Sequence, residues 1–301
     1  MRIFHKHKIE NYGIKGKNLL TDKTILITGV TGGIGRALIK LFVSHGAKVI
    51  GVARNPEKIE KLRKEVIDLH PEAKMDFVRC ELSSIGEIKK CVTKITEKIS
   101  CLDILINNAG GYFSKRYTTE DGYELTFALN YLSPFILTNL LLPVIKKSKE
   151  GKILNITSIE EKHGKLRFND LQSKKFYFGL RAYAQSKLAL VMFTRELAEK
   201  LKNTTVKVNA IHPGIVKTNI AHESLSIQSI AYRFLKYTIA IPPERAAEYI
   251  LFALTDKHFS EMTGAYIKKR KLANPNPISG DKSLREKLWN ISLELSKLRN
   301  K

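Results

Sequence analysis

The stretch at residues 23–35, KTILITGVTGGIG, decides the fold of this 301-residue chain. Its first six residues are typical of a buried parallel strand, and residues 36–46 have the pattern of an amphipathic helix ended by glycine. Between a strand and a helix, glycines allow the backbone to approach a pyrophosphate, which binds at the helix N-terminus. We therefore interpret the turn as a dinucleotide-binding site whose main residues are Gly29, Gly33 and Gly35; the alternative is a tight turn without a ligand.

Strand-like and helix-like segments alternate along the rest of the chain. Six further apolar runs are expected strands: residues 48–53, 76–79, 102–106, 152–158, 206–211 and 264–267. The longest helical pattern between them covers residues 120–147, where Pro134 is expected to kink the helix and Pro143 to end or bend it. The alternation predicts an α/β fold with a single Rossmann-type, doubly wound parallel sheet and helices on both faces.

The chain is strongly basic, with 52 Lys and Arg against 29 Asp and Glu and a formal net charge of +23. Such a charge attracts phosphate-bearing partners: an anionic cofactor, anionic lipid or nucleic acid. Because lysine is scattered along the whole chain, we assign most of the excess to a lysine-rich source composition. The nearest thing to a basic cluster is Lys268-Lys269-Arg270-Lys271. No Gly-aromatic nucleic-acid signature stands beside it, so no specific nucleic-acid partner is expected.

Several features favour a cytoplasmic protein that is at most peripheral to a membrane. The first eight residues contain no apolar core of a signal peptide, and we find no run of about 18 apolar residues that predicts a membrane-spanning helix. The three cysteines, Cys80, Cys91 and Cys101, have no metal-ligand spacing. They indicate a reducing compartment without disulfides, and no metal site is expected.

The residues after the second expected strand bear on the choice of cofactor. In a dinucleotide-binding fold, a carboxylate there binds the ribose 2′-hydroxyl and repels a 2′-phosphate. This chain has Ala53 and Arg54 instead, which favours NADP(H) over NAD(H). The alternative is that Arg54 is a solvated arginine at the start of a helix, with Asn55 as N-cap and Pro56 as first residue.

Tyr183 and Lys187 stand four residues apart in a run of helical length without internal Gly or Pro, so they should lie one turn apart on one face. A cation beside a phenol lowers the pKa of the phenol, which would allow Tyr183 to exchange a proton with an alcohol or a carbonyl near neutral pH. The alternative is a solvated helical pair without a catalytic role.

Two more polar residues are candidates for the same site. Ser158 lies at the carboxyl end of the expected strand 152–158, the edge where open parallel sheets bind ligands. Thr157 is the alternative hydroxyl, but side chains alternate along a strand, so only one of the two faces the site. Asn130 lies in an apolar setting and is either a structural bridge or a site residue.

Together these motifs resemble the short-chain dehydrogenase/reductase family over residues 23–270. Residues 28–35 resemble its cofactor turn, residues 107–110 its fourth-strand motif, and residues 213–218 the segment that closes over the nicotinamide. Its catalytic tetrad is matched in order by Asn130, Ser158, Tyr183 and Lys187. Within the family, the chain is most similar to the retinol dehydrogenase branch, on the basis of Ala53-Arg54, the long spacing from Ser158 to Tyr183, residues 193–197 and the tail 288–292.

The resemblance implies a role for each residue of the tetrad. Tyr183 would be the general acid in reduction and the general base in oxidation, and Ser158 would hydrogen-bond the substrate oxygen. Lys187 would lower the pKa of the tyrosine and hold the nicotinamide ribose, while Asn130 would position a water that relays protons to Lys187. The implied cofactor-binding residues are Gly29, Thr31, Gly32, Gly33, Ile34, Gly35, Arg54, Glu81, Leu82, Asn108, Ala109, Gly110, Tyr183, Lys187, Pro213, Gly214, Val216 and Thr218.

Two departures from the family pattern stand out. Glu81 occupies the position near the adenine where family members often have Asp. Many retinol dehydrogenases carry an N-terminal membrane helix, and residues 1–22 do not have that composition, so tight membrane attachment is not expected.

The expected organisation is a basic arm at residues 1–22, an NADP(H)-binding catalytic Rossmann domain at 23–270, and a C-terminal extension at 271–301 with an amphipathic helix from Lys282. Aromatic residues in 159–182 and 219–241 suggest pocket walls and a lid, and hence a lipophilic substrate that is retinol- or retinal-like, a steroid or a lipid aldehyde.

The expected function is an NADP(H)-dependent oxidoreductase that interconverts a carbonyl and an alcohol. Alternatives are a 3-oxoacyl or other ketoreductase, a non-catalytic nucleotide-sensing scaffold, and a basic protein that binds lipid or nucleic acid. Homo-oligomerisation and peripheral contact with an anionic membrane stay open.

Overall fold

A computed structural model describes residues 18–217 and 240–298 of the chain. Its centre is an eight-stranded sheet in the order β3-β2-β1-β4-β5-β6-β7-β8, in which every neighbouring pair is parallel except β7 and β8. The strands are β1 (Thr24–Thr28), β2 (Lys48–Ala53), β3 (Met75–Arg79), β4 (Ile104–Asn107), β5 (Lys152–Ile156), β6 (Lys207–His212), β7 (Tyr266–Lys268) and β8 (Lys271–Leu272). The predicted Rossmann-type sheet is confirmed. Its strand order reverses between β1 and β4, the point where such sheets bind ligands.

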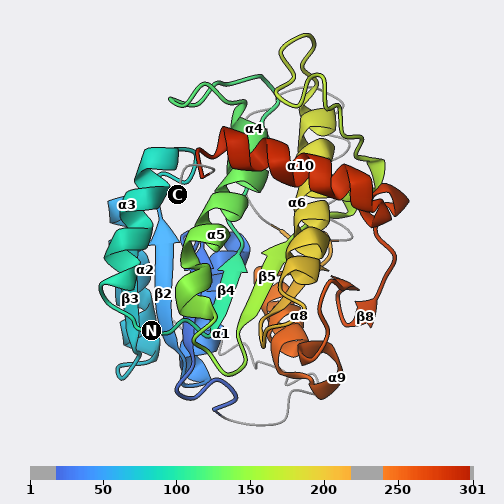
Figure 1. The fold of residues 1–301 in the computed structure, drawn as a ribbon. Helices are drawn as coiled ribbons and strands as arrows, with labels where there is room; N and C mark the ends of the chain where they lie inside the picture. The colour runs from blue at the N-terminus through green and yellow to red at the C-terminus, as the bar shows by residue number, and fades with distance from the viewer. Residues whose placement is uncertain (1–17, 218–239, 299–301) are drawn as a thin grey trace.

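Helices cover both faces of this sheet (Figure 1). One core cluster contains apolar residues of α3 (Ile85–Thr96), α5 (Ser133–Ile145), α6 (Gly179–Lys200) and α10 (Lys282–Leu295). The other contains those of α1 (Gly33–Ser44), α2 (Pro56–Leu69), α8 (Pro243–Thr255) and the short α9 (Lys257–Ser260). Because side chains alternate along a strand, β1 supplies Leu26 to the first cluster and Ile25 and Ile27 to the second, all fully buried.

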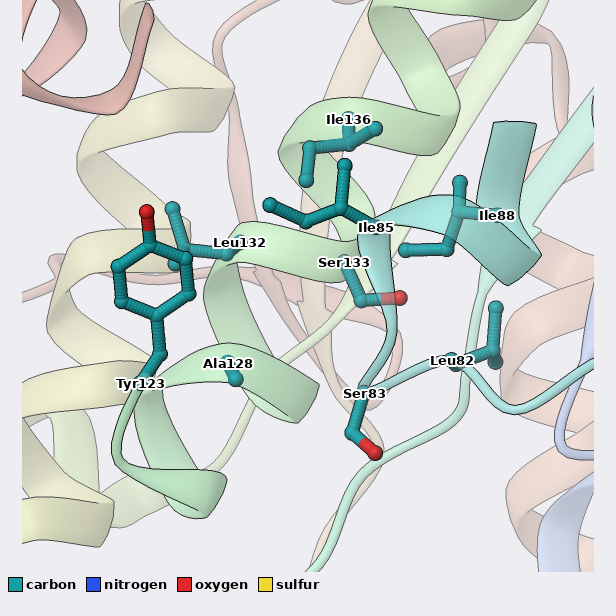
Figure 2. Close-up of a pocket in the computed structure, with 9 residues that line it drawn as sticks. All are labelled: Leu82, Ser83, Ile85, Ile88, Tyr123, Ala128, Leu132, Ser133 and Ile136. Atoms are coloured by element: carbon teal, nitrogen blue, oxygen red, sulfur yellow. The ribbon is translucent and has the colours of Figure 1, made fainter. Parts of the chain in front are cut away.

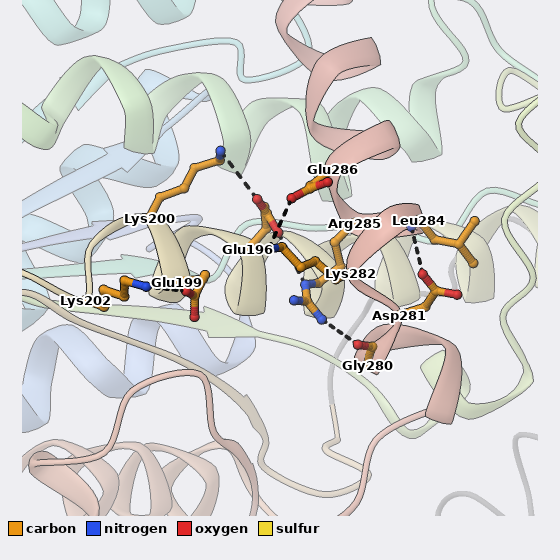
Figure 3. Close-up of polar contacts among 10 residues, drawn as sticks. All are labelled: Glu196, Glu199, Lys200, Lys202, Gly280, Asp281, Lys282, Leu284, Arg285 and Glu286. Atoms are coloured by element: carbon orange, nitrogen blue, oxygen red, sulfur yellow. Dashed lines mark hydrogen bonds and ion pairs between the residues drawn. The ribbon is translucent and has the colours of Figure 1, made fainter.

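The C-terminal helix α10 lies across α5 and α6 on the outer side of the molecule (Figure 1). Trp289 stacks on Phe193 of α6, with ring centroids 6.0 Å apart, and meets Phe135 of α5 edge-on at 5.0 Å. Arg285 donates to the buried carboxylate of Glu196 at 3.3 Å, and Lys200 pairs with the same carboxylate (Figure 3). The predicted amphipathic helix therefore packs against α6, the helix that carries Tyr183.

The helix predicted over residues 120–147 is interrupted in the structure. It consists of the single turn α4 (Leu125–Phe127), the π-helical turn η1 (Ala128–Leu132) and α5. Pro134 is the second residue of α5, directly after the π turn, and Pro143 lies inside α5, which continues to Ile145. The irregularity therefore lies before Pro134, and it places Asn130 in the wider turn, which is a common feature of functional sites.

From the sequence we expected no apolar stretch long enough to span a bilayer, and the structure corrects this expectation. Leu125–Ile145 forms a helical stretch of 21 residues that contains an 18-residue window with a mean hydropathy of 1.5, which by length and composition alone is enough to cross a membrane. Within the described ranges 18–217 and 240–298, no other helix meets this criterion. However, 72% of its apolar window is buried inside the protein. Packing between the sheet, α3 and α6 accounts for its composition, as for the core helix of a globular protein.

Other differences from the sequence expectations concern short elements and undescribed segments. Neither the antiparallel strand β8 nor the four-residue α9 was predicted, because two to four residues carry no readable period. The expected lid at 219–241 and the basic arm at 1–22 lie largely outside the described residues.

Candidate active site

Two close backbone approaches shape the glycine turn between β1 and α1. Gly29 has φ +71°, and a Cβ there would lie 2.9 Å from the Cα of Ala109. A Cβ on Gly35 would overlap the carbonyl oxygen of Gly29, which is backbone and cannot turn away. Gly32 is the N-cap of α1 and has no side chain to occupy the free N–H groups of its first turn. This cradle fits a pyrophosphate at the helix start. Thr31, Gly33 and Ile34, which were also predicted to bind the cofactor, lie in this turn and in the first residues of α1.

Thr28 and Asn108 fasten β1 to β4 beneath this turn. The Thr28 Oγ1 accepts hydrogen bonds from the backbone N–H groups of Asn108 and Ala109, at 3.0 and 2.9 Å. The side-chain amide of Asn108 donates to the Thr28 carbonyl oxygen at 2.8 Å. The amide is therefore used to hold the two strand ends together, and this fixes the backbone at Ala109 and Gly110 that would face a cofactor.

Arg54 and Glu81, both predicted to contact the cofactor, form an ion pair with 3.1 Å between Nη1 and Oε2. The Glu81 carboxylate also accepts hydrogen bonds from the backbone N–H and the hydroxyl of Ser83. Partial burial alone would raise the pKa of Glu81, but these hydrogen bonds and the Arg54 cation outweigh burial and lower it.

A second arginine stands at the same edge. Arg79, the last residue of β3, donates through Nε to the carbonyl oxygen of Arg54 at 3.4 Å. Two guanidinium groups therefore lie at the carboxyl ends of β2 and β3, where a phosphate group on the adenosine ribose would be held. The side chain of Leu82 is buried in the core, so a ligand would meet its backbone.

On α6, Tyr183 and Lys187 lie one turn apart, as predicted. The Lys187 Nζ is 5.8 Å from the centroid of the Tyr183 ring and donates to the carbonyl oxygen of Ile156, the last residue of β5, at 3.0 Å. Lys187 is buried, and burial lowers its pKa to about 8. The half-buried Tyr183 ring meets the ring of Tyr112 edge-on, with 6.0 Å between centroids.

Asn130 connects the loop after β4 to α6. Its Oδ1 accepts from the N–H of Gly111 at 2.8 Å, and its Nδ2 donates to the Gly111 carbonyl at 2.9 Å and to the Ser186 hydroxyl at 3.0 Å. A Cβ on Gly110 would lie 2.9 Å from the Asn130 Oδ1 and 3.3 Å from the Lys187 Nζ. The amide and the ammonium therefore converge over Gly110, so Asn130 is a structural bridge that also lies beside Lys187.

Ser158 follows β5 and is the N-cap of the 3₁₀ turn η2 (Ile159–His163), where its Oγ accepts from the Glu160 N–H at 3.4 Å. Ser158 is half-exposed, whereas Thr157 is buried, and its hydroxyl has no hydrogen-bond partner among the residues that the structure describes. This difference favours Ser158 over Thr157 as the hydroxyl available to a substrate.

Asn276, which the sequence did not single out, holds the turn after Ser158 in place. Its side-chain amide donates to three carbonyl oxygens, those of Glu161, Lys162 and Gly164, at 3.3, 3.1 and 3.0 Å. Its backbone N–H donates to the Glu161 carboxylate at 2.9 Å. Burial raises the pKa of Glu161. Since Asn276 directly precedes η3 (Pro277–Gly280) and α10, the C-terminal segment helps to fix the position of Ser158.

The segment predicted to close over the nicotinamide begins at the carboxyl end of β6. Gly214 has φ +110°, which favours glycine, and Val216 forms a parallel bridge with Ile241. Pro213 precedes Gly214 directly after β6, which lies between β5 and β7 in the sheet. Thr218 lies outside the described residues.

Two recesses in the described part of the chain are lined mostly by other residues, although Leu82 lines the first. One is a cavity of ≈ 10 Å³, about enough for one water, between α3, η1 and α5 (Figure 2). The other, of ≈ 330 Å³, lies beside the end of α6 and is lined by Arg195, Lys202 and Arg285 among others. Neither contains Tyr183 or Lys187. The candidate active site is defined by the polar groups of Asn130, Lys187 and Ser158 at the carboxyl ends of β4 and β5.

Comparison with known proteins decides the family. The model of short chain dehydrogenases matches residues 23–228. The chain belongs to the short-chain dehydrogenase family. It is 33% identical to Retinol dehydrogenase 13 of Homo sapiens over 289 residues, which cover 93% of this chain and 86% of that protein. It is 31% identical to Polyprenol dehydrogenase of Homo sapiens over 281 residues, covering 91% of this chain and 85% of that protein.

The fold is also similar to that of solved structures. The crystal structure of an uncharacterized protein from Mycobacterium paratuberculosis matches with a TM-score of 0.75 and 24% identity, over 92% of this chain and 94% of that one. This similarity bears on the fold alone. The predicted resemblance to the retinol dehydrogenase-like branch of the short-chain dehydrogenase family is confirmed by the more identical relatives.

In this short-chain dehydrogenase, the site region also contains four residues to which no role had been assigned from the sequence. Thr28 could have been found, because it is a hydroxyl at the last position of a strand before a glycine turn. Arg79 could also have been found, because it is a second basic residue at the end of the neighbouring strand. Tyr112 and Asn276 gave no local signal, since each reaches the site through tertiary contacts.

His212, at the end of β6, makes the stability of this short-chain dehydrogenase depend on pH. Burial, together with the cations Lys268, Lys269 and Lys162, lowers its pKa to about 4. The unfolded chain binds this proton below about pH 6.5, so the free energy of unfolding should fall by roughly 3 kcal/mol as the pH drops from 6.5 to 4, and His212 should contribute no slope above 6.5.

Denaturant titrations at several pH values check this expectation. His212→Asn should flatten the profile between pH 6.5 and 4, whatever its effect at neutral pH. His163→Asn, at an exposed histidine, should keep the wild-type profile. Equal slopes for His212→Asn and the wild type would contradict the assignment.

Proposed function

We propose that the chain is an NADP(H)-dependent oxidoreductase that transfers a hydride between the nicotinamide and a lipophilic carbonyl or alcohol. The observation that carries the proposal is the convergence of Lys187 and Asn130 over Gly110, one helical turn from Tyr183. Ser158 stands at the end of β5, to whose last carbonyl Lys187 is bonded. Family membership supports the reaction type, and the glycine cradle at Gly29 and Gly35 supports the dinucleotide.

The chemistry follows from the positions of these side chains. When bound, the nicotinamide supplies or accepts the hydride. Tyr183 gives a proton to the substrate oxygen in reduction and takes it back in oxidation. Ser158 donates a hydrogen bond to the same oxygen and stabilises the charge that develops on it.

Lys187 supports Tyr183 electrostatically. With a pKa of about 8, it is mainly charged at and below neutral pH, and a cation 5.8 Å from the phenol ring favours the phenolate. Because Lys187 is buried and in hydrogen-bond contact with Ile156, it cannot swing away from the site. The Asn130 amide is equally fixed, and its Oδ1 lies where it can orient a water toward the Lys187 Nζ.

The proposed preference for NADP(H) rests on Arg54 and Arg79 and on the lack of a carboxylate at position 53 or 54. A 2′-phosphate would share Arg54 with Glu81. Sharing is feasible because the Arg54 side chain is 77% exposed and can therefore reorient. Charge-assisted hydrogen bonds to a phosphate are directional and strong enough to set the preference.

Arg54→Ala is expected to raise the KM for NADPH by about tenfold or more, as expected for a lost charge-assisted hydrogen bond, and to change the KM for NADH by less than about twofold. Initial rates with each cofactor measure both values. Lys90→Ala removes an exposed ion pair with Glu87 on α3 and is the matched control, expected to change neither. An equal effect of Arg54→Ala on both cofactors would show that Arg54 does not read the 2′-phosphate.

The substrate class is proposed from two observations. The named relatives are dehydrogenases of retinol and of polyprenol, which are both long apolar alcohols. The residues before α6 expose Phe176 and Phe178, at 63% and 50%. The aromatic content of residues 159–182 is not all available to a ligand, however, because Phe168 packs against the core and lies under Lys287 of α10.

A rate screen tests the proposal. The purified chain is supplied with NADPH or NADH and with all-trans-retinal, a polyprenal, a long-chain fatty aldehyde, a steroid ketone and a 3-oxoacyl thioester, and loss of reduced cofactor is followed. We expect turnover of at least one apolar aldehyde, faster with NADPH. Turnover of the thioester alone would instead favour the ketoreductase, and cofactor binding without any turnover would favour the nucleotide-sensing scaffold.

A further inference from the structure

Two neighbouring stretches before α6 and after β4 carry an unusual combination of exposed aromatic and basic side chains. We define residues 112–118 and 174–181 as the aromatic-basic surface. Of the eight large hydrophobic side chains that are exposed in residues 18–217 and 240–298, four lie in it: Tyr117, Phe176, Phe178 and Leu180, with exposures of 42%, 63%, 50% and 44%. Figure 1 shows both loops at the same end of the molecule, above the N-terminus of α6.

Direct contacts join the two stretches into one surface. The Tyr177 hydroxyl donates to the carbonyl oxygen of Phe113 at 2.8 Å. Arg116 donates to the carbonyl oxygen of Gln172, two residues before the second stretch, at 3.2 Å. A Cβ on Gly179 would lie only 2.5 Å from the Phe113 carbonyl oxygen. The exposed side chains are therefore held on an ordered support.

The charge of this surface has one sign. The two stretches contain five basic residues and no acidic one; the basic residues are Lys115, Arg116, Lys174, Lys175 and Arg181. Three acidic residues lie next to the two stretches in the sequence. Asp170 accepts hydrogen bonds from the backbone N–H groups of Lys174 and Lys175, so it holds the loop. Glu120 and Asp121, just after the first stretch, accept hydrogen bonds from the Ser84 hydroxyl and the Ile85 N–H. The Arg181 guanidinium lies 5.8 Å from the centre of the Phe178 ring. Protruding aromatics surrounded by cations match the interfacial region of a bilayer with anionic headgroups.

We propose that the aromatic-basic surface docks on an anionic phospholipid bilayer, with Phe176, Phe178 and Leu180 inserted among the headgroups. The surface leads directly to the proposed catalytic tyrosine, because Tyr112 contacts the Tyr183 ring and Gly179 begins the helix one turn before it. Docking would thus place the entrance of the site at the membrane surface, where a lipophilic alcohol or aldehyde is dissolved. Only this consequence rests on the proposed function, whereas the docking itself does not.

Co-sedimentation of the full chain with vesicles tests the docking separately from activity. The chain should bind vesicles of phosphatidylcholine with phosphatidylserine and bind pure phosphatidylcholine vesicles far less, with binding weakened by salt. Phe176→Ser with Phe178→Ser, and Lys174→Glu with Lys175→Glu, should each lower the partition coefficient by about tenfold or more. Since all of these side chains are exposed, the variants should fold, which circular dichroism verifies.

Matched controls lie on α2, where exposed Ile67 and Leu69 (43% and 60%) and exposed Lys61 and Lys64 allow the same two changes: Ile67→Ser with Leu69→Ser, and Lys61→Glu with Lys64→Glu. These controls should bind as the wild type does, and all variants keep the basic residues 1–17.

Equal loss in the α2 variants, or no binding by the wild type, would overturn the proposal. Concentration-dependent self-association that Phe176→Ser with Phe178→Ser abolishes, without vesicle binding, would also overturn it and assign the surface to a second copy of the chain. A chain that binds vesicles but turns over no substrate would leave the docking intact and refute only the proposed function.

Discussion

Tyr183→Phe is expected to lower kcat by about 10²–10⁴-fold and to leave the dissociation constant for NADPH nearly unchanged. The variant keeps the ring that packs against Tyr112 and lies 5.8 Å from the Lys187 ammonium, so the fold and the charge of the site are retained. What is lost is the hydroxyl that exchanges a proton with the substrate oxygen. Steady-state rates with a responsive aldehyde, together with NADPH fluorescence titration, measure the two quantities.

Tyr123→Phe is the control for this prediction. The Tyr123 hydroxyl donates to the carbonyl oxygen of Leu295 at 2.8 Å, between the loop before α4 and the end of α10, away from the converging groups. Its loss should change kcat by less than about twofold. If Tyr183→Phe turned over at the wild-type rate, the assignment of the general acid and base would be wrong.

Gly35→Ala is expected to have the largest effect on stability, lowering the free energy of unfolding by roughly 3 kcal/mol or preventing folding. The added methyl group would overlap the carbonyl oxygen of Gly29 and crowd the amide of Asn108 at 2.8 Å. Neither can give way easily, because the first is backbone and the second is bonded to Thr28. Urea denaturation of the wild type and of Gly35→Ala measures the difference in the free energy of unfolding. Gly35→Ala should also lose NADPH binding.

Gly32→Ala, three residues away in the same turn, is the matched control. Gly32 has φ −108°, which any residue adopts, and the nearest atom to a Cβ would be the Gly29 carbonyl oxygen at 3.9 Å. The substitution should therefore cost no more than about 1 kcal/mol, mainly through the weaker N-cap. Similar destabilisation by both substitutions would contradict the account of how the turn is packed.

Local sequence patterns predicted the elements that surround the site. The strand, glycine turn and helix at residues 23–46 appear as β1 and α1, and Asn55 caps α2 through a bond from the Lys58 N–H, as expected. The sheet was predictable because a continuous alternation of strands and helices permits few arrangements. The spacing of Tyr183 and Lys187 fixed their common face on α6 because an α-helix has a regular period.

What local patterns could not predict depends on tertiary contacts. The ion pair between Arg54 and Glu81 joins residues 27 positions apart, and the bonds from Asn276 to the Ser158 turn join residues more than 110 apart. The π turn at Asn130 was also missed, because its own residues, Ala128–Leu132, have ordinary helical composition.

Transfer of deuterium shows directly whether this site moves a hydride between nicotinamide and a carbonyl. The wild-type chain is given NADPH deuterated at the nicotinamide C4 and an apolar aldehyde, and the product alcohol is analysed by mass spectrometry. Deuterium should appear on the carbinol carbon with the wild type and the Tyr123→Phe control, and should be nearly absent with Tyr183→Phe. Tight binding of NADPH with no deuterated alcohol from any carbonyl tested would contradict hydride transfer at this site.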